Sequence, residues 1–447
     1  MHLDRVERIV IRRSDPQYKV CVRLCQCAKR LGNCAAYTLR QNLFQGKSFL
    51  SRTDLDKQLR AESGSDYRAM PPAASARRQG QIIHEQLKAF FASSDEYKAH
   101  PEKFRGRPRL PGYAKRFRTF VVGRNGYKIE DSMLIITGSE KSGFEPVRVR
   151  CCENRVFNAK REDAVTGDLR ICPKGNTFII ELTYRREVPD NNPAVLLNRD
   201  NALAIDLGID NLAACSPTRP GVPPLLIRGG ALKSVNQWWN KRTAVLRSEG
   251  KYGHIGSITF RRSCQIGDLM HKASHAVITY CKVYDIGTII IGLNPDWKQR
   301  CGMGTVNNQK FVFLPHRELI GKICYKAEEL GIRVIIREES YTSKASSPDF
   351  DPLPASCQDG AHYRFSGRRI RRGLYRTKSG RVINADLNGS INLARKELGD
   401  GWLRSLLADG GLVDRPVVIR NLHDRLDCAA LLKRGYRASE TTCVSMW

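Results

Sequence analysis

Apolar and polar positions alternate with two different spacings along the chain, one typical of strands and one typical of helices. In the first half, the runs VERIVIRRSD, LIITG, VRVRCCENR and TFIIELTYRREV are short and are separated by Gly, Pro and Asn, which predicts antiparallel strands. Helical spacing predicts two helices, over about 27–44 and about 74–91. The apolar face of the second helix comprises Ile82, Ile83, Leu87, Phe90 and Phe91. This half therefore predicts an antiparallel β-barrel or sheet together with a helical lobe.

The pattern changes to α/β after the segment PDNNPAVLLNRDN, which is typical of a linker. The runs ALAIDLG, NLAACSP and PLLIRGG predict three successive strands, and a long polar helical stretch covers about 233–284. Then follow the strand GTIIIGLN, a helix over about 315–330, the strand IRVIIREES and a helix over 384–398. Three strands and then alternating helices and strands is the order of an RNase H-like fold. The last 45 or so residues have little periodicity, and we expect part of them to be disordered.

Composition narrows the class of protein. A chain of 447 residues with 41% hydrophobic residues suggests two or three domains. Lys and Arg outnumber Asp and Glu by 75 to 45, a formal charge of +30, so the compact chain repels itself unless a polyanion is bound. Nucleic acid is the natural partner. Because no run of 18 apolar residues and no apolar signal core occur, we expect an intracellular protein without a membrane partner.

The 15 cysteines include no C-x-x-C pair, which argues against a disulfide framework and against a zinc ribbon. We expect most of them to be reduced core residues. A metal cluster is the alternative for four cysteines near the N-terminus, but cysteines on one helical face more often simply pack. These four are Cys21, Cys25, Cys27 and Cys34.

A basic segment begins at Pro101 and reads PEKFRGRPRLPGYAKRFRTFVV, with aromatic residues between the cations. Such a segment has no core of its own, and we favour an arm that contacts a nucleic-acid backbone over a solvated loop. Its candidate contacts are Arg105, Arg107, Arg109, Tyr113, Lys115 and Arg116. The adjacent Trp238 and Trp239 are instead expected to pack in a core, with base stacking as the alternative.

Two aspartates about 180 residues apart carry the most chemistry. Asp206 sits where the apolar run 203–205 meets a glycine turn, so its carboxylate projects from a buried strand, a costly position unless the charge is used. Asp386 opens the last predicted helix, with Asn384 and Asn388 able to hold it in place. Separated acids fixed on rigid backbone are what a metal site for phosphodiester cleavage needs.

Six ordered strings, AIDLGIDNLA, IIIGLNPDWKQ, FLPHRELIGKICYKAEELGIRV, EESYTSKASS, FSGRRIRRGLY and INADLNGSINLARK, resemble the RuvC nuclease domain of TnpB. TnpB is the RNA-guided nuclease of bacterial and archaeal insertion sequences. The similarity covers roughly 200–398, and RGRPRLPGYAKR is similar to a segment of the family's N-terminal half. Six ordered motifs at compatible spacing are far more specific than any one of them.

The resemblance implies a domain layout in which an RNase H-like RuvC domain follows an N-terminal β-barrel. The parts are a β-barrel wedge domain formed by 1–30 and 101–190, an inserted helical recognition domain over 31–100, a linker over 191–200, the RuvC-like domain over 201–398, and a tail over 399–447. The RuvC-like domain would carry the helical insertion at about 233–284 and a basic loop over 343–383.

The resemblance further implies a prokaryotic cytoplasmic protein, associated with the nucleoid, that holds a guide RNA copied from the transposon end. Such a protein recognises a short motif beside the target and cuts the double-stranded DNA that the guide pairs with. Base pairing then reads most of the sequence, while the protein reads shape and the short motif. A transposase encoded by the same element is a further candidate partner, and one or two copies per guide RNA are both open.

Asp206 and Asp386 match the first and last catalytic acids of the RuvC site, where two Mg²⁺ ions would activate water and stabilise the leaving oxygen. The middle acid departs from the pattern, because many relatives have a glutamate where IIIGLNPDWKQ carries Gly292. A subset of the family has its glutamate in the EESYTS segment instead. We therefore select Glu339, with Glu338 as the alternative, since side chains alternate along a strand and only one of the two can face the site.

Three other readings of this region stay open. A structural salt bridge of the glutamate to Arg337 or Lys344 is one, Asp296 in a predicted loop is a less favoured third acid, and a dead nuclease is the last. A second departure concerns zinc: relatives commonly carry two C-x-x-C pairs in the following loop, whereas here only Cys357 and His362 occur. One thiol and one imidazole cannot close a tetrahedral site, so we expect no structural zinc.

The stretch 364–381 holds seven Arg and one Lys with no acid, so we expect it to lie along phosphate rather than pack inward. Further nucleic-acid contacts are therefore predicted at Lys298, Lys344, Arg368, Arg369, Arg371 and Arg372. The leading hypothesis is a Mg²⁺-dependent, RNA-guided DNA endonuclease of the TnpB type. A compact type V CRISPR effector is the first alternative, and a nuclease-dead RNA-guided transcriptional regulator is the second.

Overall fold

The structure is a computed structural model that divides into two compact units. Unit 1 comprises Met1–Asp190 and Tyr252–Phe260, and unit 2 comprises Asn191–Lys251 and Arg261–Trp447. The residues that the structure describes are 2–104, 106–138, 143–150, 164–187, 197–293, 315–354, 363–371, 373–408 and 415–422. Among them, no helix is both long and apolar enough to cross a membrane.

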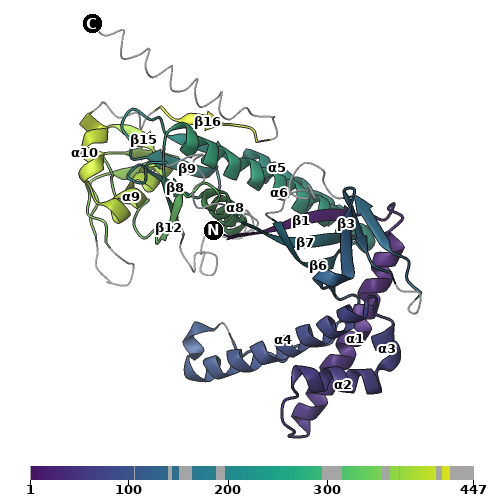
Figure 1. The fold of residues 1–447 in the computed structure, drawn as a ribbon. Coiled ribbons are helices and arrows are strands. Elements are labelled where there is room, and N and C mark those ends of the chain that lie inside the picture. The colour runs from purple at the N-terminus through teal and green to yellow at the C-terminus, as the bar shows by residue number, and fades with distance from the viewer. Residues whose placement is uncertain are drawn as a thin grey trace. The chain divides into compact units, whose positions relative to one another are not determined.

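Unit 1 contains two antiparallel sheets (Figure 1). The first has the strand order β1-β7-β6-β2 and the second the order β3-β4-β5. The strands are β1 His2–Ile11, β2 Phe120–Val122, β3 Tyr127–Glu130, β4 Met133–Ile136, β5 Val147–Arg150, β6 Ala164–Lys174 and β7 Thr177–Glu187. The four runs that sequence analysis assigned to strands all form strands, whereas β2, β3 and β6 were not predicted.

A helical lobe accompanies these sheets. It comprises α1 Tyr18–Phe44, α2 Arg52–Glu62, α3 Gly64–Arg68 and α4 Ala73–Ala99, with short 3₁₀ turns η1 Pro101–Lys103 and η2 Arg124–Gly126 beyond it. Helices α1 and α4 extend past the predicted 27–44 and 74–91. Helix α2 was missed because only Leu55 and Leu59 of its eleven residues are buried, too few for a periodic signal, although Ser51 caps its first turn.

Unit 2 is built on a six-stranded mixed sheet of order β12-β11-β8-β9-β10-β16. Its strands are β8 Ala202–Asp206, β9 Asn211–Pro217, β10 Leu225–Arg228, β11 Thr288–Gly292, β12 Arg333–Arg337 and β16 Val417–Ile419. Strands β8, β9 and β10 are antiparallel neighbours, whereas β11 runs parallel to both β8 and β12. Five of these strands were predicted, and β16 adds a parallel strand beside β10.

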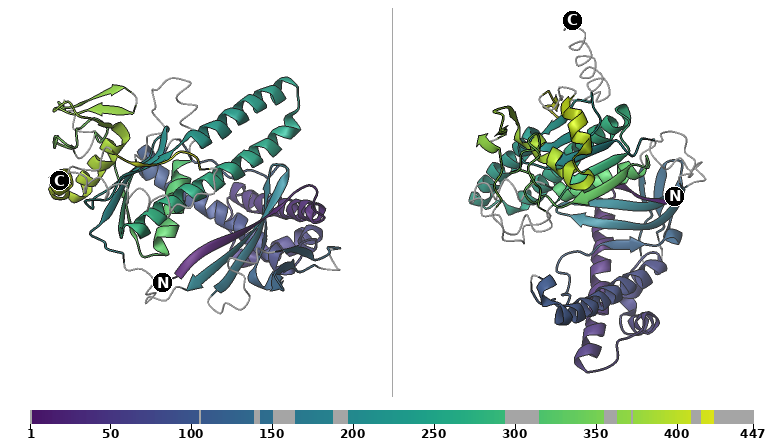
Figure 2. Two further views of the ribbon diagram at one scale, coloured as in Figure 1. Left: turned by 90° about the horizontal axis from the view of Figure 1, so that it is seen from above. Right: turned by 90° about the vertical axis from the view of Figure 1, so that its left-hand side faces the viewer.

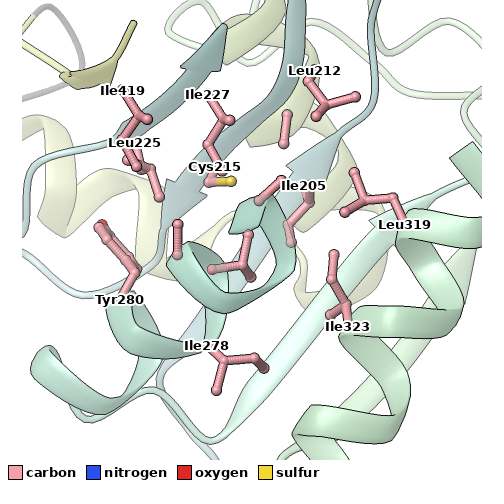
Figure 3. Close-up of a cluster of buried hydrophobic side chains, with 14 of the residues drawn as sticks. Ile205, Leu212, Cys215, Leu225, Ile227, Ile278, Tyr280, Leu319, Ile323 and Ile419 are labelled. Carbon is pink, nitrogen blue, oxygen red and sulfur yellow. The ribbon is translucent and has the colours of Figure 1, made fainter. Parts of the chain in front are cut away.

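Helices cover both faces of this sheet. They are α5 Gly230–Ser248, α6 Tyr252–Val283, α8 His316–Glu328, α9 Ala385–Leu398 and α10 Gly401–Ala408. Figure 2 shows α5 and α6 running side by side where sequence analysis predicted one helical stretch. Figure 3 shows the larger apolar core, in which Ile278 and Tyr280 of α6 and Leu319 and Ile323 of α8 pack against Ile205 and its neighbours on one face of the sheet.

On the opposite face of the sheet, where α9 lies, strand β8 presents small side chains. Leu203 and Ile205 of β8 belong to the α6 and α8 core, while Ala202 and Ala204 pack with Leu393 of α9. Side chains on a strand alternate between faces, and Asp206 follows the two alanines by the same step of two. The sequence of β8 therefore both allows α9 to approach closely and aims Asp206 at it.

The described part of the C-terminal segment contains α10 and β16, which are too short to give a periodic signal, and partial disorder elsewhere in it stays a prediction. One expectation differs from the structure. Trp238 is 43% exposed instead of packed in a core, with Arg261 over its ring at 5.8 Å. Among the cysteines, Cys21 and Cys25 are buried in the unit 1 core as expected.

The buried Tyr280 provides a test of this core. Its hydroxyl donates to the carbonyl oxygen of Pro223 at 2.6 Å, so Tyr280→Phe leaves a buried carbonyl without that bond. We expect unfolding in urea to shift by about 1–2 kcal/mol toward lower stability. Tyr252→Phe is the matched control, because Tyr252 is 66% exposed, and equal midpoints for the two variants would contradict the assignment.

Candidate active site

Asp386 is fixed by the first turn of α9. The side chain of Asn384 caps this helix and accepts the backbone N–H groups of Asp386 at 2.9 Å and Leu387 at 3.1 Å. A carboxylate in the first turn also interacts favourably with the helix dipole. Asn388, which sequence analysis placed beside Asp386, instead accepts from the backbone and hydroxyl of Ser347. Only Asn384 therefore holds the aspartate as predicted.

Asp206 reaches α9 through a glycine. A side chain at Gly389 would bring its Cβ within 2.6 Å of Asp206 Oδ2, so the carboxylate lies where that side chain would stand. Gly389 follows Asp386 by three positions and lies on the same face of the helix. The absence of a side chain at Gly389 therefore lets the carboxylate of Asp206 approach the face of α9 on which Asp386 lies.

Glu339 reaches the same region through a second glycine. Gly292 ends β11 directly opposite Arg337 of β12, and its neighbour Ile291 is in register with Ile205 of β8. A Cβ at Gly292 would lie 2.4 Å from Glu339 Oε1 and 2.7 Å from Glu339 Cγ. The side chain of Glu339 thus occupies the space above the position where the sequence lacks the expected glutamate.

Glu338 is turned to other partners. It pairs with Lys396 of α9 at 3.4 Å and accepts from the hydroxyl of Ser340. Arg337, one of the residues considered as an ion-pair partner for these glutamates, pairs with Glu397. Asp296, the less favoured third acid, lies outside the described residues.

The charges of the three carboxylates are coupled. Burial, followed by the charge of Asp386, raises the pKa of Asp206 to about 7, and Arg369 opposes this. Burial, followed by the charges of Asp206 and Glu338, raises the pKa of Glu339 to about 8, and Lys396 opposes this. Asp206 therefore interacts with an acid on each side of it, one from α9 and one from the end of β12. Asp206 and Glu339 are fully ionised at neutral pH only when a cation balances their charge.

A polar network that sequence analysis missed supports Asp386. The buried Asn211 donates to Asp386 Oδ2 at 2.7 Å, and Arg228 donates to Asn211 Oδ1 at 2.9 Å. Arg369 lies 3.6 Å from the other oxygen of Asp386. The only sequence signal for Asn211 was its place in AIDLGIDNLA, and Arg228 ends an otherwise apolar run, so neither pattern distinguished a functional role.

A cavity of about 540 Å³ opens beside this network. Its lining includes Asn211, Arg228, Arg369, Arg371 and Asp386. Because three guanidinium groups and one predicted catalytic acid face the same space, the cavity has the charge of a site for a phosphate chain.

Most of the predicted nucleic-acid contacts are on the surface. Arg105, Lys298 and Arg372 lie outside the described residues, and the exposed ones are Arg107, Arg109, Tyr113, Lys115, Arg116, Lys344, Arg368, Arg369 and Arg371. The arm that carries the first five is tethered along α1. Asn33 exchanges two hydrogen bonds with the backbone of Ala114, and Arg40 donates to Pro111 and stacks on Tyr113.

Metal ligation was considered for the described residues. Among these, no three His, Cys, Asp or Glu side chains come together closely enough to hold an ion in their present positions. The carboxylate oxygens around Asp206 nevertheless suit a hard divalent cation. Cys357 and His362, on which the zinc prediction depends, lie outside the described residues.

Two family models match parts of the chain. Residues 183–297 match the family OrfB_IS605, described as a probable transposase, and residues 316–393 match the Cas12f1-like TNB domain. The two ranges carry most of the six motifs quoted from the sequence, and they confirm the resemblance to TnpB. None of the curated proteins matches the chain.

Solved structures give a likeness in fold. The chain is similar to Cas12f1 in a Cas12f1–sgRNA–target DNA complex, with a TM-score of 0.50 and 14% identity over 85% of this chain and 83% of that one. It is also similar to the mini-RNA-guided endonuclease CRISPR-Cas_phi3, with a TM-score of 0.46 and 10% identity over 88% and 92%. The α/β architecture is thus that of Cas12f1, while identity this low shows the fold alone.

The raised pKa values predict how the metal-free protein responds to pH. A carboxyl group whose pKa is higher in the folded than in the unfolded state contributes stability below about pH 4, and this contribution is lost as pH rises through the folded pKa. For Asp206 and Glu339 the loss falls between about pH 4 and 8. We expect Asp206→Asn to be more stable than the wild type at pH 8 in chelator, by about 1–2 kcal/mol, and close to it near pH 4.

Urea denaturation at several pH values measures this difference. Asp268→Asn is the control, because Asp268 is an exposed acid that pairs with Lys272 on α6. Parallel stability profiles for Asp206→Asn and the wild type would contradict the coupling.

Proposed function

We propose that this chain is an RNA-guided DNA endonuclease of the TnpB type, with Asp206, Glu339 and Asp386 as its catalytic acids. The observation that carries the proposal is the setting of Asp206, whose carboxylate lies against Gly389 of α9 and interacts electrostatically with both Asp386 and Glu339. The strand order β10-β9-β8-β11-β12 supports an RNase H-like RuvC domain. Both family matches and the fold likeness to Cas12f1 agree with it.

The acids are proposed to hold Mg²⁺, and two features favour this. Their oxygen donors are those that Mg²⁺ prefers, and their mutual repulsion is relieved by a divalent cation. Two Mg²⁺ ions bound here would lower the pKa of the attacking water and stabilise the leaving oxygen in phosphodiester cleavage.

The protein's own groups bind and orient the DNA strand. Arg228, Arg369 and Arg371 line the cavity beside Asp386 and are suited to bidentate contacts with phosphate oxygens. Asn211 keeps one oxygen of Asp386 in place. A single strand laid along these guanidinium groups would bring a phosphate to the carboxylates, which is the positioning that accounts for much of the rate of such enzymes.

The exposed cations of the arm and of the basic stretch 364–381 support guide RNA and target DNA as partners. The complex with guide RNA and target DNA in which Cas12f1 was solved agrees with this. A compact type V effector shares all of these features, and its gene would lie beside a repeat array instead of within a transposon end. A nuclease-dead regulator would bind target DNA and leave it uncut in Mg²⁺.

Substitution of the relocated acid tests the proposal. We expect Glu339→Ala to lose at least a hundredfold in cleavage rate while guide-dependent target binding is kept, because the residue lies at the proposed metal site and away from the exposed cations. Glu338→Ala is the matched control, since its carboxylate pairs with Lys396. Rates come from single-turnover cleavage of labelled target in Mg²⁺, and affinities from binding in Ca²⁺.

If Glu339→Ala cleaves normally and Glu338→Ala loses cleavage, then Glu338 and not Glu339 is the catalytic acid. No cleavage by the wild type under any divalent ion, with tight target binding, would favour the regulator.

Moving the glutamate from position 339 to position 292 tests whether the two side chains compete for the same space. Because a side chain at Gly292 and the side chain of Glu339 compete for one space, Gly292→Ala should reduce cleavage at least tenfold although it removes no ligand. The double variant Gly292→Glu, Glu339→Ala should regain activity over Glu339→Ala alone. Gly321→Ala is the control, since nothing lies within 4 Å of a Cβ there. Full activity of Gly292→Ala would show that the two positions do not share their space.

A further inference from the structure

We propose that Asp349 and Asp351 position the arginine-bearing sheet beside Asp386 through a clasp of hydrogen bonds. The clasp is defined as Ser346, Asp349, Asp351 and Ser366 with their hydrogen bonds. This proposal rests on the proposed nuclease function for its effect on cleavage, but the clasp itself is a property of the fold.

The clasp joins two segments that are twenty residues apart. Asp351 Oδ2 accepts the backbone N–H of Ser346 at 2.8 Å and that of Ser366 at 3.0 Å. Asp349 Oδ2 accepts the hydroxyls of the same two serines, at 2.5 Å and 3.3 Å. Each serine therefore donates once to each aspartate, and the two acids tie the serines together as a cross-link would.

The clasp also holds the basic sheet. This three-stranded sheet comprises β13 Arg368–Arg371, β14 Leu374–Arg376 and β15 Val382–Asn384. The backbone N–H of Lys378, in the turn between β14 and β15, donates to Asp349 Oδ2 at 2.8 Å, and the hydroxyl of Tyr375 donates to the carbonyl of Lys344 at 2.8 Å. Ser366 precedes β13 and Lys378 follows β14, and these two strands pair Arg368 with Arg376, so one end of the sheet is anchored to the segment that carries the aspartates.

On its other side this segment is bound to α9. Ser347 is held by Asn388, and Asn392 donates to the carbonyls of Thr342 and Ala345 at 2.9 Å and 2.7 Å. Arg395 donates to the carbonyl of Asp351 at 3.0 Å. The segment over 342–351 thus links the helix that carries Asp386 to the sheet that carries Arg369.

The link through residues 342–351 determines the position of the arginines on β13. Arg368, Arg369 and Arg371 are all exposed, and the basic sheet has few buried side chains, Tyr375 and Ile383 among them. With so small a core of its own, the sheet is held at one end by the clasp and at the other by β15, which runs directly into α9. Arg369 lies 3.6 Å from Asp386, so a shift of the sheet would change the proposed active site through this residue.

The bonds of the clasp differ from those of a surface ion pair. Asp351 is only 6% exposed and Ser346 is fully buried, and the hydrogen-bond donors named above are neutral N–H and O–H groups. Removing an acceptor therefore leaves buried donors unsatisfied. Because the bonds to each aspartate converge on a single oxygen, an asparagine can keep them with its amide oxygen, whereas an alanine cannot.

The experiment compares Asp351→Ala, Asp349→Ala and Asp351→Asn with the wild type in two measurements. Amide hydrogen exchange of the full chain should rise at least tenfold over 364–384 in both alanine variants and should stay near wild type in Asp351→Asn. Single-turnover cleavage by the guide complex should fall at least tenfold in the alanine variants and less than threefold in Asp351→Asn. Asp268→Ala, which removes an exposed acid of α6, is the charge-matched control and should change neither.

A double-variant cycle identifies the route. If the clasp acts through Arg369, Asp351→Ala combined with Arg369→Ala should cleave no more slowly than Arg369→Ala alone. Additive losses would overturn the proposal, as would unchanged exchange over 364–384 in a folded Asp351→Ala. Should Asp351→Ala fail to fold, Asp349→Ala decides by the same criteria, because Asp349 is only half-buried. A wild type that cuts no DNA would refute the proposed nuclease, while the exchange measurement would still decide on the clasp.

Discussion

The close approach of α9 to the bare face of the unit 2 sheet is the constraint on which the rest depends. Ala202 and Ala204 present methyl groups where bulkier residues would hold the helix away, and Leu387 and Leu393 bury their side chains in return. The same approach forces like charges together, which is unfavourable in a desolvated place. Apolar packing on both faces of the sheet therefore stabilises an arrangement that the carboxylates alone would break apart.

Two glycines provide the space that the carboxylates of Asp206 and Glu339 occupy. At Gly389 the absent side chain admits Asp206, and at Gly292 it admits Glu339. A side chain at Gly292 and the side chain of Glu339 cannot both occupy this space. If Glu339 is the catalytic acid, as proposed, then a glycine at position 292 is the steric condition for it.

The sequence was informative wherever packing imposes a period. The strands and helices around Asp206 and Asp386 were predicted because buried runs of four or five residues and an amphipathic helix leave clear patterns. The choice of Glu339 rested on resemblance and on alternation; its side chain lies over Gly292, and its catalytic role stays a prediction. Asn211, Arg228 and the clasp could not be predicted, because single hydrogen bonds between residues distant in sequence leave no periodic trace. Trp238 was misjudged since hydrophobic character alone does not report exposure.

The electrostatic balance also bears on whether this chain cuts DNA. In a protein that binds no cation at this place, exchanging Asp206 or Glu339 for its amide would remove repulsion and raise stability near neutral pH. The raised pKa values of Asp206 and Glu339 express that cost. A metal-dependent nuclease, as proposed, would use this arrangement, whereas a DNA binder without metal would not. The interactions of Asp206 with Asp386 and Glu339, beside a cavity lined by arginines, are therefore the physical argument for the proposed enzyme over the proposed regulator.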